Sequence, residues 1–397
     1  MGAAQAGEAC LLRQVQISKM GQAEEMIRTF QYRLNPTGRQ TRTLTAWLVV
    51  SCDLYNAALQ ERRDAWKLRR KSITYFDQCH ELAEMRAEDA DVRAVPSDIE
   101  REPLRRVNRA FQGFFRRCRK GNGKAGFPRF RSKVRYDSLA FPAVGMSDGW
   151  ISVPKLGWIR FKAHRPLIGI PKNVIIKRQG KVWRVSIACE MGEAPERKPI
   201  RSAVGIDVGV AQFVTLSDGQ AVENPRWLKA SEGQLAKANQ LLARKKRGSR
   251  NRLRARIALG RVHERIANRR KNFCHHVSKW LVEKYDLIAH EDLKIRNMVR
   301  GERSLNKSIL DAGWNILLTQ VTYKAASAGK WVVPVDPRGT SQRCSRCGTT
   351  VKKKLSERIH DCPACGLSLD RDHNAALNIL AAGKAAAGLG PSEVQAT

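Results

Sequence analysis

The sequence predicts two units of different class, a β structure interrupted by helices in the first half and an α/β sheet in the second. In the first half, apolar residues alternate over residues 26–34, and strand patterns return only at 138–190, after a long helical stretch. In the second half, short apolar strands come first and then alternate with helices. We therefore expect a small β-barrel or sandwich split by a helical insertion, followed by an α/β domain.

The first half begins with a strand at residues 26–34, which the turn residues at 35–38 bring to an end. Apolar residues then recur three and four apart, as in an amphipathic helix: Leu44, Trp47, Leu48, Ser51, Leu54, Tyr55, Ala58 and Leu59. The helical pattern continues as far as Phe115. The clearest hairpin spans residues 174–189 and turns at Gly180.

The second half starts with an apolar strand at residues 203–210, interrupted by one acid, Asp207. A hairpin with its turn at residues 217–219 follows. Next comes a helical region, for which we expect breaks near Gly248 and Gly260. The remaining elements are expected as a strand at 287–293, a helix at 309–326 and a strand at 331–335. Residues 1–24 and 384–397 are predicted to be a disordered leader and tail.

The charge of the chain makes nucleic acid the expected partner. Lys and Arg number 73 and Asp and Glu 37, which gives a formal net charge of +36. Duplex DNA carries one negative charge per about 1.7 Å, so this excess could neutralise about 60 Å of duplex. An ordinary metabolic enzyme is not expected at such an imbalance; the alternative is a protein that is merely basic. No segment has the length of apolar sequence that a membrane span requires, and a signal peptide is not expected.

Two segments concentrate the positive charge. Residues 116–135 carry nine basic residues and no acid, with Phe127 and Phe130 between them, which suits phosphate contact and base stacking through Arg129 and Arg131. Residues 244–271 carry 13 basic residues and one acid. The candidates for phosphate contact in this second segment are Lys245, Lys246, Arg247, Arg250, Arg254, Arg265 and Arg269. A solvated loop or helix face is the alternative for both segments.

Four of the ten cysteines form two C-x-x-C pairs, Cys344 with Cys347 and Cys362 with Cys365. A Gly follows each pair, and two thiolates three residues apart in a tight turn can reach one face of a tetrahedral Zn²⁺. A redox dithiol is the competing interpretation, but two such pairs separated only by the segment 348–361 favour one structural zinc ion and a reducing cytosol. His360 is a further candidate ligand, expected instead to be a surface neighbour.

Three acids far apart in the sequence stand at positions where a lone carboxylate is costly or unexplained. Asp207 lies inside an apolar strand, Glu291 ends another, and Asp372 precedes a helical pattern, with Asp370 close by as a possible cap. Hydrolysis of a phosphodiester by two Mg²⁺ ions needs several carboxylates to hold the metals. Each acid also has a structural alternative: a buried turn, a strand-end ion pair or a helix cap.

Four segments in order resemble the TnpB (OrfB) family of insertion sequences, whose RuvC-like RNase H domain is shared with the miniature type V CRISPR nucleases. These segments are G-I-D-V-G at 205–209, H-E-D-L at 290–293, T-S-Q-x-C-x-x-C-G at 340–348, and C-P-x-C-G through D-R-D-x-N-A-A-x-N-I at 362–379. The first strand, the helical insert and G-F-P-R-F at 126–130 also resemble the family. The resemblance implies that Asp207, Glu291 and Asp372 bind two Mg²⁺ and that the cysteines form a zinc ribbon.

The resemblance also implies a domain plan. A β-barrel at 25–37 and 136–195 would hold a helical recognition insertion at 38–135, and a RuvC-like domain at 200–340 and 367–383 would hold the zinc ribbon at 341–366. It implies an RNA-guided DNA endonuclease that pairs a guide RNA with target DNA. The expected location is a prokaryotic cytoplasm, at the nucleoid when the protein is bound to DNA. One monomer per guide RNA is favoured. The alternatives are a non-cleaving RNA-guided repressor, a miniature type V CRISPR effector and a guide-free nuclease.

Overall fold

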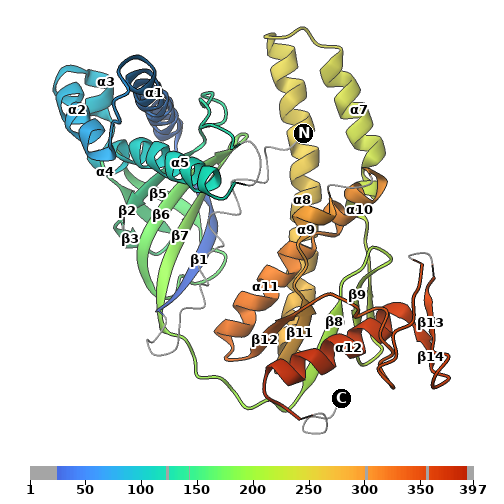
Figure 1. The fold of residues 1–397 in the computed structure, drawn as a ribbon. Helices are drawn as coiled ribbons and strands as arrows, with labels where there is room; N and C mark the ends of the chain where they lie inside the picture. The colour runs from blue at the N-terminus through green and yellow to red at the C-terminus, as the bar shows by residue number, and fades with distance from the viewer. Residues whose placement is uncertain (1–24, 122–124, 143, 300–302, 355–356, 391–397) are drawn as a thin grey trace. The chain divides into compact units, whose positions relative to one another are not determined.

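The computed structural model describes residues 25–121, 125–142, 144–299, 303–354 and 357–390. They divide into two compact units, one of residues 25–192 and one that starts at residue 193 (Figure 1). The predicted leader and residues 391–397 of the predicted tail lie outside the described residues. Within the described ranges, no helix has both the length and the apolar character needed to cross a membrane.

The first unit is built on a seven-stranded sheet with strand order β2-β6-β7-β1-β5-β4-β3. Its strands are β1 (Glu25–Asn35), β2 (Ser138–Pro142), β3 (Met146–Ser147), β4 (Trp150–Val153), β5 (Gly157–Lys162), β6 (Ile170–Gln179) and β7 (Val182–Glu193). The first strand lies in the middle of the sheet and pairs antiparallel with β5, which follows it in the chain only after the helical insertion. The sheet is a curved half-barrel with β2 and β3 at its edges, in the part of the chain where the sequence predicted a small barrel or sandwich (Figure 1).

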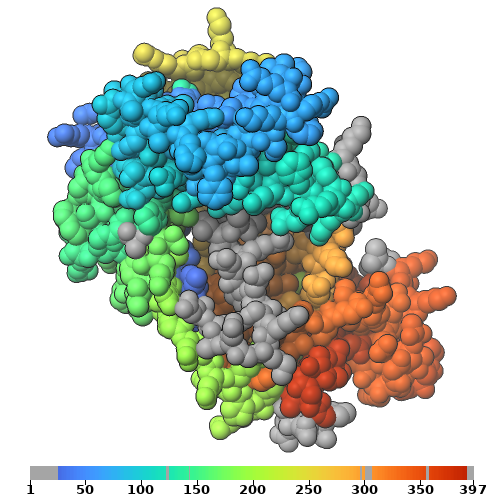
Figure 2. Space-filling view, turned by 60° about the vertical axis from the view of Figure 1, so that its left-hand side comes forward, coloured from blue at the N-terminus to red at the C-terminus, as the bar shows by residue number. Residues whose placement is uncertain are grey.

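The helices described between β1 and β2 are α1 (Gly38–Arg69), α2 (Tyr75–Glu88), α3 (Ala90–Ala94), α4 (Ser97–Glu100) and α5 (Glu102–Arg119). The α1 helix begins at a capping box, because the Thr37 hydroxyl accepts from the Gln40 N–H while the Gln40 side chain accepts from the Thr37 N–H. All eight residues predicted for the inner face of this helix are buried, and seven of them, all except Ser51, share one core with Phe30, Tyr32 and Leu34 of β1. The helices form one closely packed layer (Figure 2).

The second unit contains a five-stranded sheet with order β10-β9-β8-β11-β12. Its strands are β8 (Ala203–Asp207), β9 (Gln212–Leu216), β10 (Ala221–Glu223), β11 (Leu287–Glu291) and β12 (Trp331–Val335). The first three strands are antiparallel, whereas β11 runs parallel to both β8 and β12. The two strands that carry Asp207 and Glu291 are therefore neighbours, and both end at the same edge of the sheet.

Helices cover both faces of this second sheet. The helices described in this unit are α6 (Trp227–Ala230), α7 (Glu232–Ala243), α8 (Arg250–Lys284), α9 (Ile295–Met298), α10 (Arg303–Ala312), α11 (Trp314–Ser327) and α12 (Arg371–Ala386). On one face, α8 and α11 pack against Val204, Ile206 and Ile288. On the other face, α12 packs against Ala203, Leu287 and Ala289. Strand alternation thus assigns alternate residues of β8 and β11 to opposite helical layers.

Three details of the second unit differ from the sequence prediction. The expected break at Gly248 is present, but Gly260 lies inside the continuous α8 helix, where packing of neighbouring residues Val262 and Ile266 offsets the weak helix propensity of glycine. The single helix expected at 309–326 is two helices, α10 and α11, because Gly313 adopts a positive φ of 73° between them. The predicted tail begins too early, since α12 continues to Ala386.

Candidate functional site

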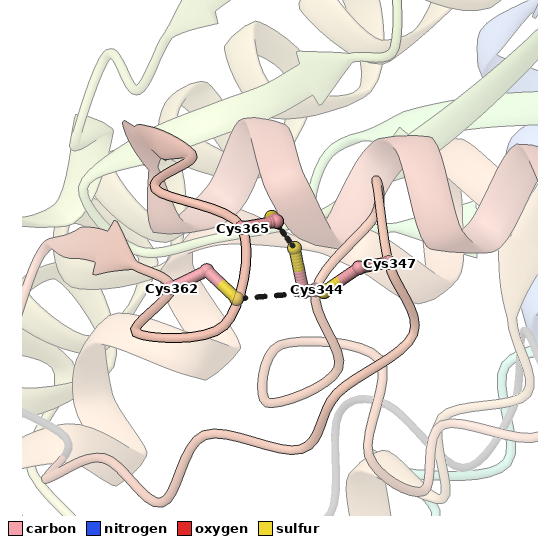
Figure 3. Close-up of side chains that lie close together, drawn as sticks. All are labelled: Cys344, Cys347, Cys362 and Cys365. Atoms are coloured by element: carbon pink, nitrogen blue, oxygen red, sulfur yellow. Dashed lines mark hydrogen bonds between the residues drawn. The ribbon is translucent and has the colours of Figure 1, made fainter.

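The four paired cysteines come together in one cluster, with all four Sγ atoms within 4.8 Å of one another (Figure 3). The Sγ of Cys344 lies 3.6 Å from that of Cys365, and the Sγ of Cys347 lies 3.5 Å from that of Cys362. Four sulfur atoms about 2.3 Å from a tetrahedral zinc ion would lie about 3.8 Å apart. The spacing of the thiols therefore fits a single tetrahedral metal ion held by four protein ligands.

Both cysteine pairs form the same turn. The N–H of Gly348 donates to the Cys344 carbonyl, and the N–H of Gly366 donates to the Cys362 carbonyl, each at 2.9 Å. Both glycines have positive φ, 77° and 69°, as the spacing predicted. Hydrogen bonding to Thr349 lowers the pKa of the Cys347 thiol to about 6, which favours the thiolate that a metal needs.

His360 does not belong to this cluster, and its expected position at the surface is wrong. It lies in the short strand β13 (Ile359–Asp361), which pairs with β14 (Ser368–Asp370), and its side chain is completely buried. Burial lowers the pKa of His360, so the ring is neutral near pH 7. The side chain of His360 is buried because β13 pairs with β14, and this pairing could not be predicted from the sequence.

Asp207 and Glu291 are the last residues of β8 and β11. The two strands are in register at Ile206 and His290, so one residue further on both strands end in an acid. By alternation Asp207 shares a face with Ala203, and Glu291 shares a face with Ala289, both of which contact the α12 layer. The two carboxylates therefore lie at adjacent strand ends on the face that α12 covers.

The third acid, Asp372, lies in the first turn of α12. This helix packs very close to the sheet: a Cβ on Gly205 would lie 2.1 Å from the Ala376 carbonyl oxygen, and a Cβ on Gly383 would lie 2.3 Å from the Ala289 side chain. Only glycine fits these two contacts, which fix the helix against β8 and β11. The position of Asp372 next to the other two acids follows from this packing.

Asp370, the neighbouring acid, has a different role. Its side chain accepts hydrogen bonds from the N–H groups of Asp372 and His373, at 2.8 and 3.1 Å, and so caps α12. Asp372 lies 3.8 Å from Arg358 and does not cap the helix. The structure therefore separates two acids that the residue pattern alone left as alternatives.

The three acids share an electrostatic environment. Burial, followed by the nearby carboxylates of Glu291 and Asp372, raises the pKa of Asp207 to about 8. Burial also raises the pKa of Glu291 and of Asp372. Neighbouring carboxyl groups with raised pKa values can bind a divalent cation, because its positive charge would favour the ionised form of each group.

The acids are spread more widely than the thiols. Among the described residues, the cysteines are the only group of three or more metal-binding side chains whose ligand atoms all lie within 4.8 Å. Two ions about 3.5–4 Å apart, with oxygen ligands at about 2.1 Å on either side, would separate the outer ligands by up to about 8 Å. A looser set of acids is therefore compatible with two ions and not with one compact site.

The basic segment 244–271 lies on a hairpin of α7 and α8, which stands out from the sheet (Figure 1). Its small apolar core contains Leu235, Val262 and Ile266. The predicted contact residues are all exposed: Lys245, Lys246, Arg247, Arg250, Arg254, Arg265 and Arg269. Two other arginines are used internally, since Arg252 donates to carbonyls at the end of α7 and Arg270 forms an ion pair with Asp311 at 2.6 Å.

The predicted basic loop at 116–135 begins within α5, which continues to Arg119, so its first residues are helical. Residues 125–135 form no helix or strand but are held by hydrogen bonds. Asn56 of α1 makes two hydrogen bonds to the backbone of Arg131, at 2.8 and 2.9 Å, and Arg117 donates to the Gly126 carbonyl. Phe127 and Phe130 remain 45% and 48% exposed. The side chains of Arg129 and Arg131 are exposed, although the Arg131 guanidinium lies 5.1 Å above the Tyr55 ring.

Three residues of the second unit were missed by the sequence reasoning. Asn374 and Asn378, one turn apart on α12, hydrogen-bond to the segment that enters the first cysteine turn. Thr340 in that segment donates to the Glu291 carboxylate. All three residues lie in the motifs at 340–348 and 362–379, but their hydrogen-bond partners are determined only by the packing of α12.

Three family models match the chain. A model described as "Probable transposase" matches residues 186–302, a "Cas12f1-like, TNB domain" model matches residues 314–379, and a "Helix-turn-helix domain" model matches residues 26–71. Over the last range, the structure has one strand and one continuous helix, β1 and α1. The first two ranges include all three acids and all four clustered cysteines.

Relatives cover almost the whole chain. The "Putative RNA-guided DNA endonuclease InsQ" of Escherichia coli (strain K12) is 32% identical over 90% of this chain and 93% of its own length. A "Putative RNA-guided DNA endonuclease" of Streptomyces pristinaespiralis is 33% identical over 92% of both chains. Among solved structures, a Cas12f1-sgRNA-target DNA complex matches with a TM-score of 0.34 and 15% identity, over 89% of this chain and 99% of that one. The identity and coverage of the two relatives establish that the chain belongs to the TnpB (OrfB) family of insertion-sequence proteins.

Proposed function

We propose that this protein is an RNA-guided DNA endonuclease that hydrolyses DNA at Asp207, Glu291 and Asp372. The relatives that share about a third of its sequence over nine-tenths of its length bear that name. The observation that carries the proposal is the convergence of three acids from distant parts of the chain on one face of the sheet. Besides burial, the carboxylates of the other two acids help to raise the pKa of Asp207. Retention of all three argues against a non-cleaving RNA-guided repressor.

The arrangement assigns a role to each acid. Asp207 interacts with both other carboxylates, and Asp207, Glu291 and Asp372 would together hold the metal ions. Two Mg²⁺ ions bound there would supply an activated water and offset the charge that develops on the scissile phosphate. Asp370 would keep the first turn of α12, and with it Asp372, in place.

We propose a division of labour between the two units. Residues 200–340 and 367–383 would be the RuvC-like RNase H domain, and residues 341–366 a zinc ribbon with one structural Zn²⁺. Residues 25–37 and 136–195, with the insertion at 38–135, would hold the duplex of guide RNA and target DNA, so that base pairing supplies sequence specificity. A cytoplasmic site of action follows from this role.

Cleavage of a plasmid tests the proposal directly. Full-length protein, its guide RNA and Mg²⁺ should cut a plasmid that carries the target beside a library of flanking motifs. Asp207→Asn should lower the rate by at least about 10³-fold, because the central metal ligand is lost while guide pairing is not. Asp292→Asn is the matched control, since this exposed acid follows Glu291 directly, just beyond the end of β11. An intact plasmid with every motif, or full cutting by Asp207→Asn, would overturn the proposal.

The cationic hairpin supplies a test of nucleic-acid binding. Arg250, Arg254 and Arg265 lie within about 60° of one another around α8 and extend over about 22 Å of its axis. The described part of the chain shows no ion pair for these three arginines. Replacing all three with Gln should weaken binding of the guide RNA. The slope of the logarithm of the binding constant against the logarithm of the salt concentration should fall by the equivalent of about two to three phosphate contacts. Lys279→Gln, on the same helix but paired with Glu283, should change neither quantity.

A further inference from the structure

The segment between β12 and the first cysteine turn passes beside the carboxylate of Glu291. In it the Thr340 hydroxyl donates to Oε1 of Glu291, 49 residues earlier in the chain. The same hydroxyl lies 3.2 Å from the Pro337 carbonyl, but its single proton can serve only one acceptor fully. Among the described residues, no other side chain is hydrogen-bonded to this carboxylate.

Thr340 is itself held from the other side by α12. The Asn378 side chain donates to the carbonyls of Thr340 and Arg343, at 2.8 and 2.7 Å. One turn earlier, the fully buried Asn374 donates to the Arg343 carbonyl and accepts from the Ser345 N–H, at 2.8 and 2.9 Å. Two amide side chains on one face of the helix therefore fix residues 340–345.

The helix that holds Thr340 also carries Asp372 in its first turn. It contributes this acid directly and acts on Glu291 through Asn378 and Thr340. The fixed segment continues into Cys344, whose Sγ lies 3.6 Å from that of Cys365. The cysteine cluster, the α12 helix and the carboxylate site are thus joined by one chain of contacts within the second unit.

We propose that Thr340 is a positioning residue for Glu291, and that Asn378 and the cysteine cluster act on the carboxylate site through it. A glutamate at the end of a strand has several side-chain rotamers. The Thr340 hydroxyl selects one by binding Oε1, and it leaves Oε2 available for a metal ion. Partners of this kind orient a ligand before the metal arrives, and their removal costs about 10–100-fold in metal affinity or activity. This inference rests on the proposed nuclease function.

The test compares Thr340→Val with Thr340→Ser in the full-length protein. Valine keeps the volume of threonine without the hydroxyl, and serine keeps the hydroxyl without the methyl group. Mn²⁺ binding is measured on the nucleic-acid-free protein by electron paramagnetic resonance, and cleavage is measured on the guide complex over a range of Mg²⁺ concentrations. Thr340→Val should weaken Mn²⁺ binding and raise the Mg²⁺ requirement by about 10–100-fold, with most of the rate recovered at saturating metal.

The controls separate positioning from folding. Thr340→Ser should match the wild type, as should Gln342→Ala, an exposed neighbour in the same segment. Asn378→Ala should shift the Mg²⁺ requirement in the same direction as Thr340→Val but by less, because the Thr340 side chain remains. Zinc content and melting temperature of each variant show whether the cysteine cluster is intact. If Thr340→Val destroys the fold, Asn378→Ala and Thr340→Ser still test the proposal.

Two outcomes would overturn the inference. One is wild-type Mn²⁺ affinity in Thr340→Val, and the other is an equal defect in Thr340→Ser, which would assign the effect to packing. Failure of the proposed function gives a different result, since the wild type would then neither bind Mn²⁺ at this site nor cut its target. The inference fails alone when the wild type does both and Thr340→Val behaves in the same way.

Discussion

The cysteine cluster and the carboxylate cluster belong to the same unit, yet they are assembled in opposite ways. The four thiols come from two turns of one short segment, 344–365, and each turn closes its own backbone hydrogen bonds. The three acids come from two strands and a helix that are distant in sequence, at positions 207, 291 and 372. The compact set suits one metal ion, and the wider set suits two.

This difference shows how the stability of one site can serve the chemistry of the other. A cluster built from local turns is formed mainly by its own short segment, with added hydrogen bonds from Asn374 and Asn378 of α12, and a bound metal would fix its geometry. A site spread over β8, β11 and α12 depends on the packing of all three elements, which is why glycine is needed at Gly205 and Gly383. The segment that holds Thr340 lies between the two sites and connects them.

The largest effect is expected from breaking the compact site. Cys362→Ser should release the zinc ion and destabilise the second unit by several kcal/mol, since metal binding and local folding are coupled. Because residues 340–345 lose their anchor, cleavage should also need more Mg²⁺. Zinc content by mass spectrometry and thermal melting check this result. Cys118→Ser, at an exposed cysteine of α5, is the control and should change neither. Unchanged zinc content and melting in Cys362→Ser would contradict the compact metal site.

A smaller effect on stability is expected at the site of the three acids, where a substitution should stabilise the metal-free protein. The pKa of Asp207 is raised to about 8 in the folded protein, while an unfolded Asp titrates near 4. Between these values the folded state holds a proton that the unfolded state has lost, so stability of the metal-free protein falls as pH rises from about 4 to 8. Asp207→Asn mimics the protonated side chain and should remove this loss.

Thermal melts at several pH values check this expectation. Without metal, Asp207→Asn should match the wild type near pH 4 and exceed it by up to a few kcal/mol at pH 7. Added Mg²⁺ should stabilise the wild type at pH 7–8 and stabilise Asp207→Asn much less. Asp292→Asn should behave like the wild type throughout. A difference between Asp207→Asn and the wild type that does not grow with pH would show that Asp207 is not the strained member of the cluster.

The same contrast explains what the sequence could predict. Local signals were reliable: the helix face from Leu44 to Leu59 is buried, and the hairpin at 174–189 turns at Gly180. The cysteine turns and their trailing glycines are also local. The role of a residue that contacts a distant part of the chain could not be predicted, because one residue type fits several roles until its partner is known. Gly260 looked like a break and is helical, whereas Gly205 in its strand is required by α12, a helix near the other end of the second unit.

The acids show this limit most clearly. The sequence predicted Glu291 at a strand end and Asp372 at the start of a helix, but it placed Asp207 inside a strand that ends at this residue. The convergence of the three acids depends on the parallel pairing of β8 with β11 and on the packing of α12. The motif resemblance, and not the spacing of the acids, is the basis for expecting Asp372 rather than Asp370 at the metal site. The roles of Asn374, Asn378 and Thr340 were absent from that reasoning because their hydrogen-bond partners are distant in the chain and are brought to them only by folding.

The smallest effect is expected at Asp370, which sharpens the distinction between an acid that caps and an acid that binds metal. Asp370→Ala removes the acceptor for the N–H groups of Asp372 and His373 and should cost about 1 kcal/mol of stability. Cleavage at saturating Mg²⁺ should fall by no more than a few-fold, because the Asp372 carboxylate remains. Asp370→Asn keeps the capping oxygen and should be close to the wild type in both measurements. If Asp370→Asn instead abolished cleavage while melting normally, the charge of Asp370 would belong to the metal site, and the carboxylate cluster would have four members.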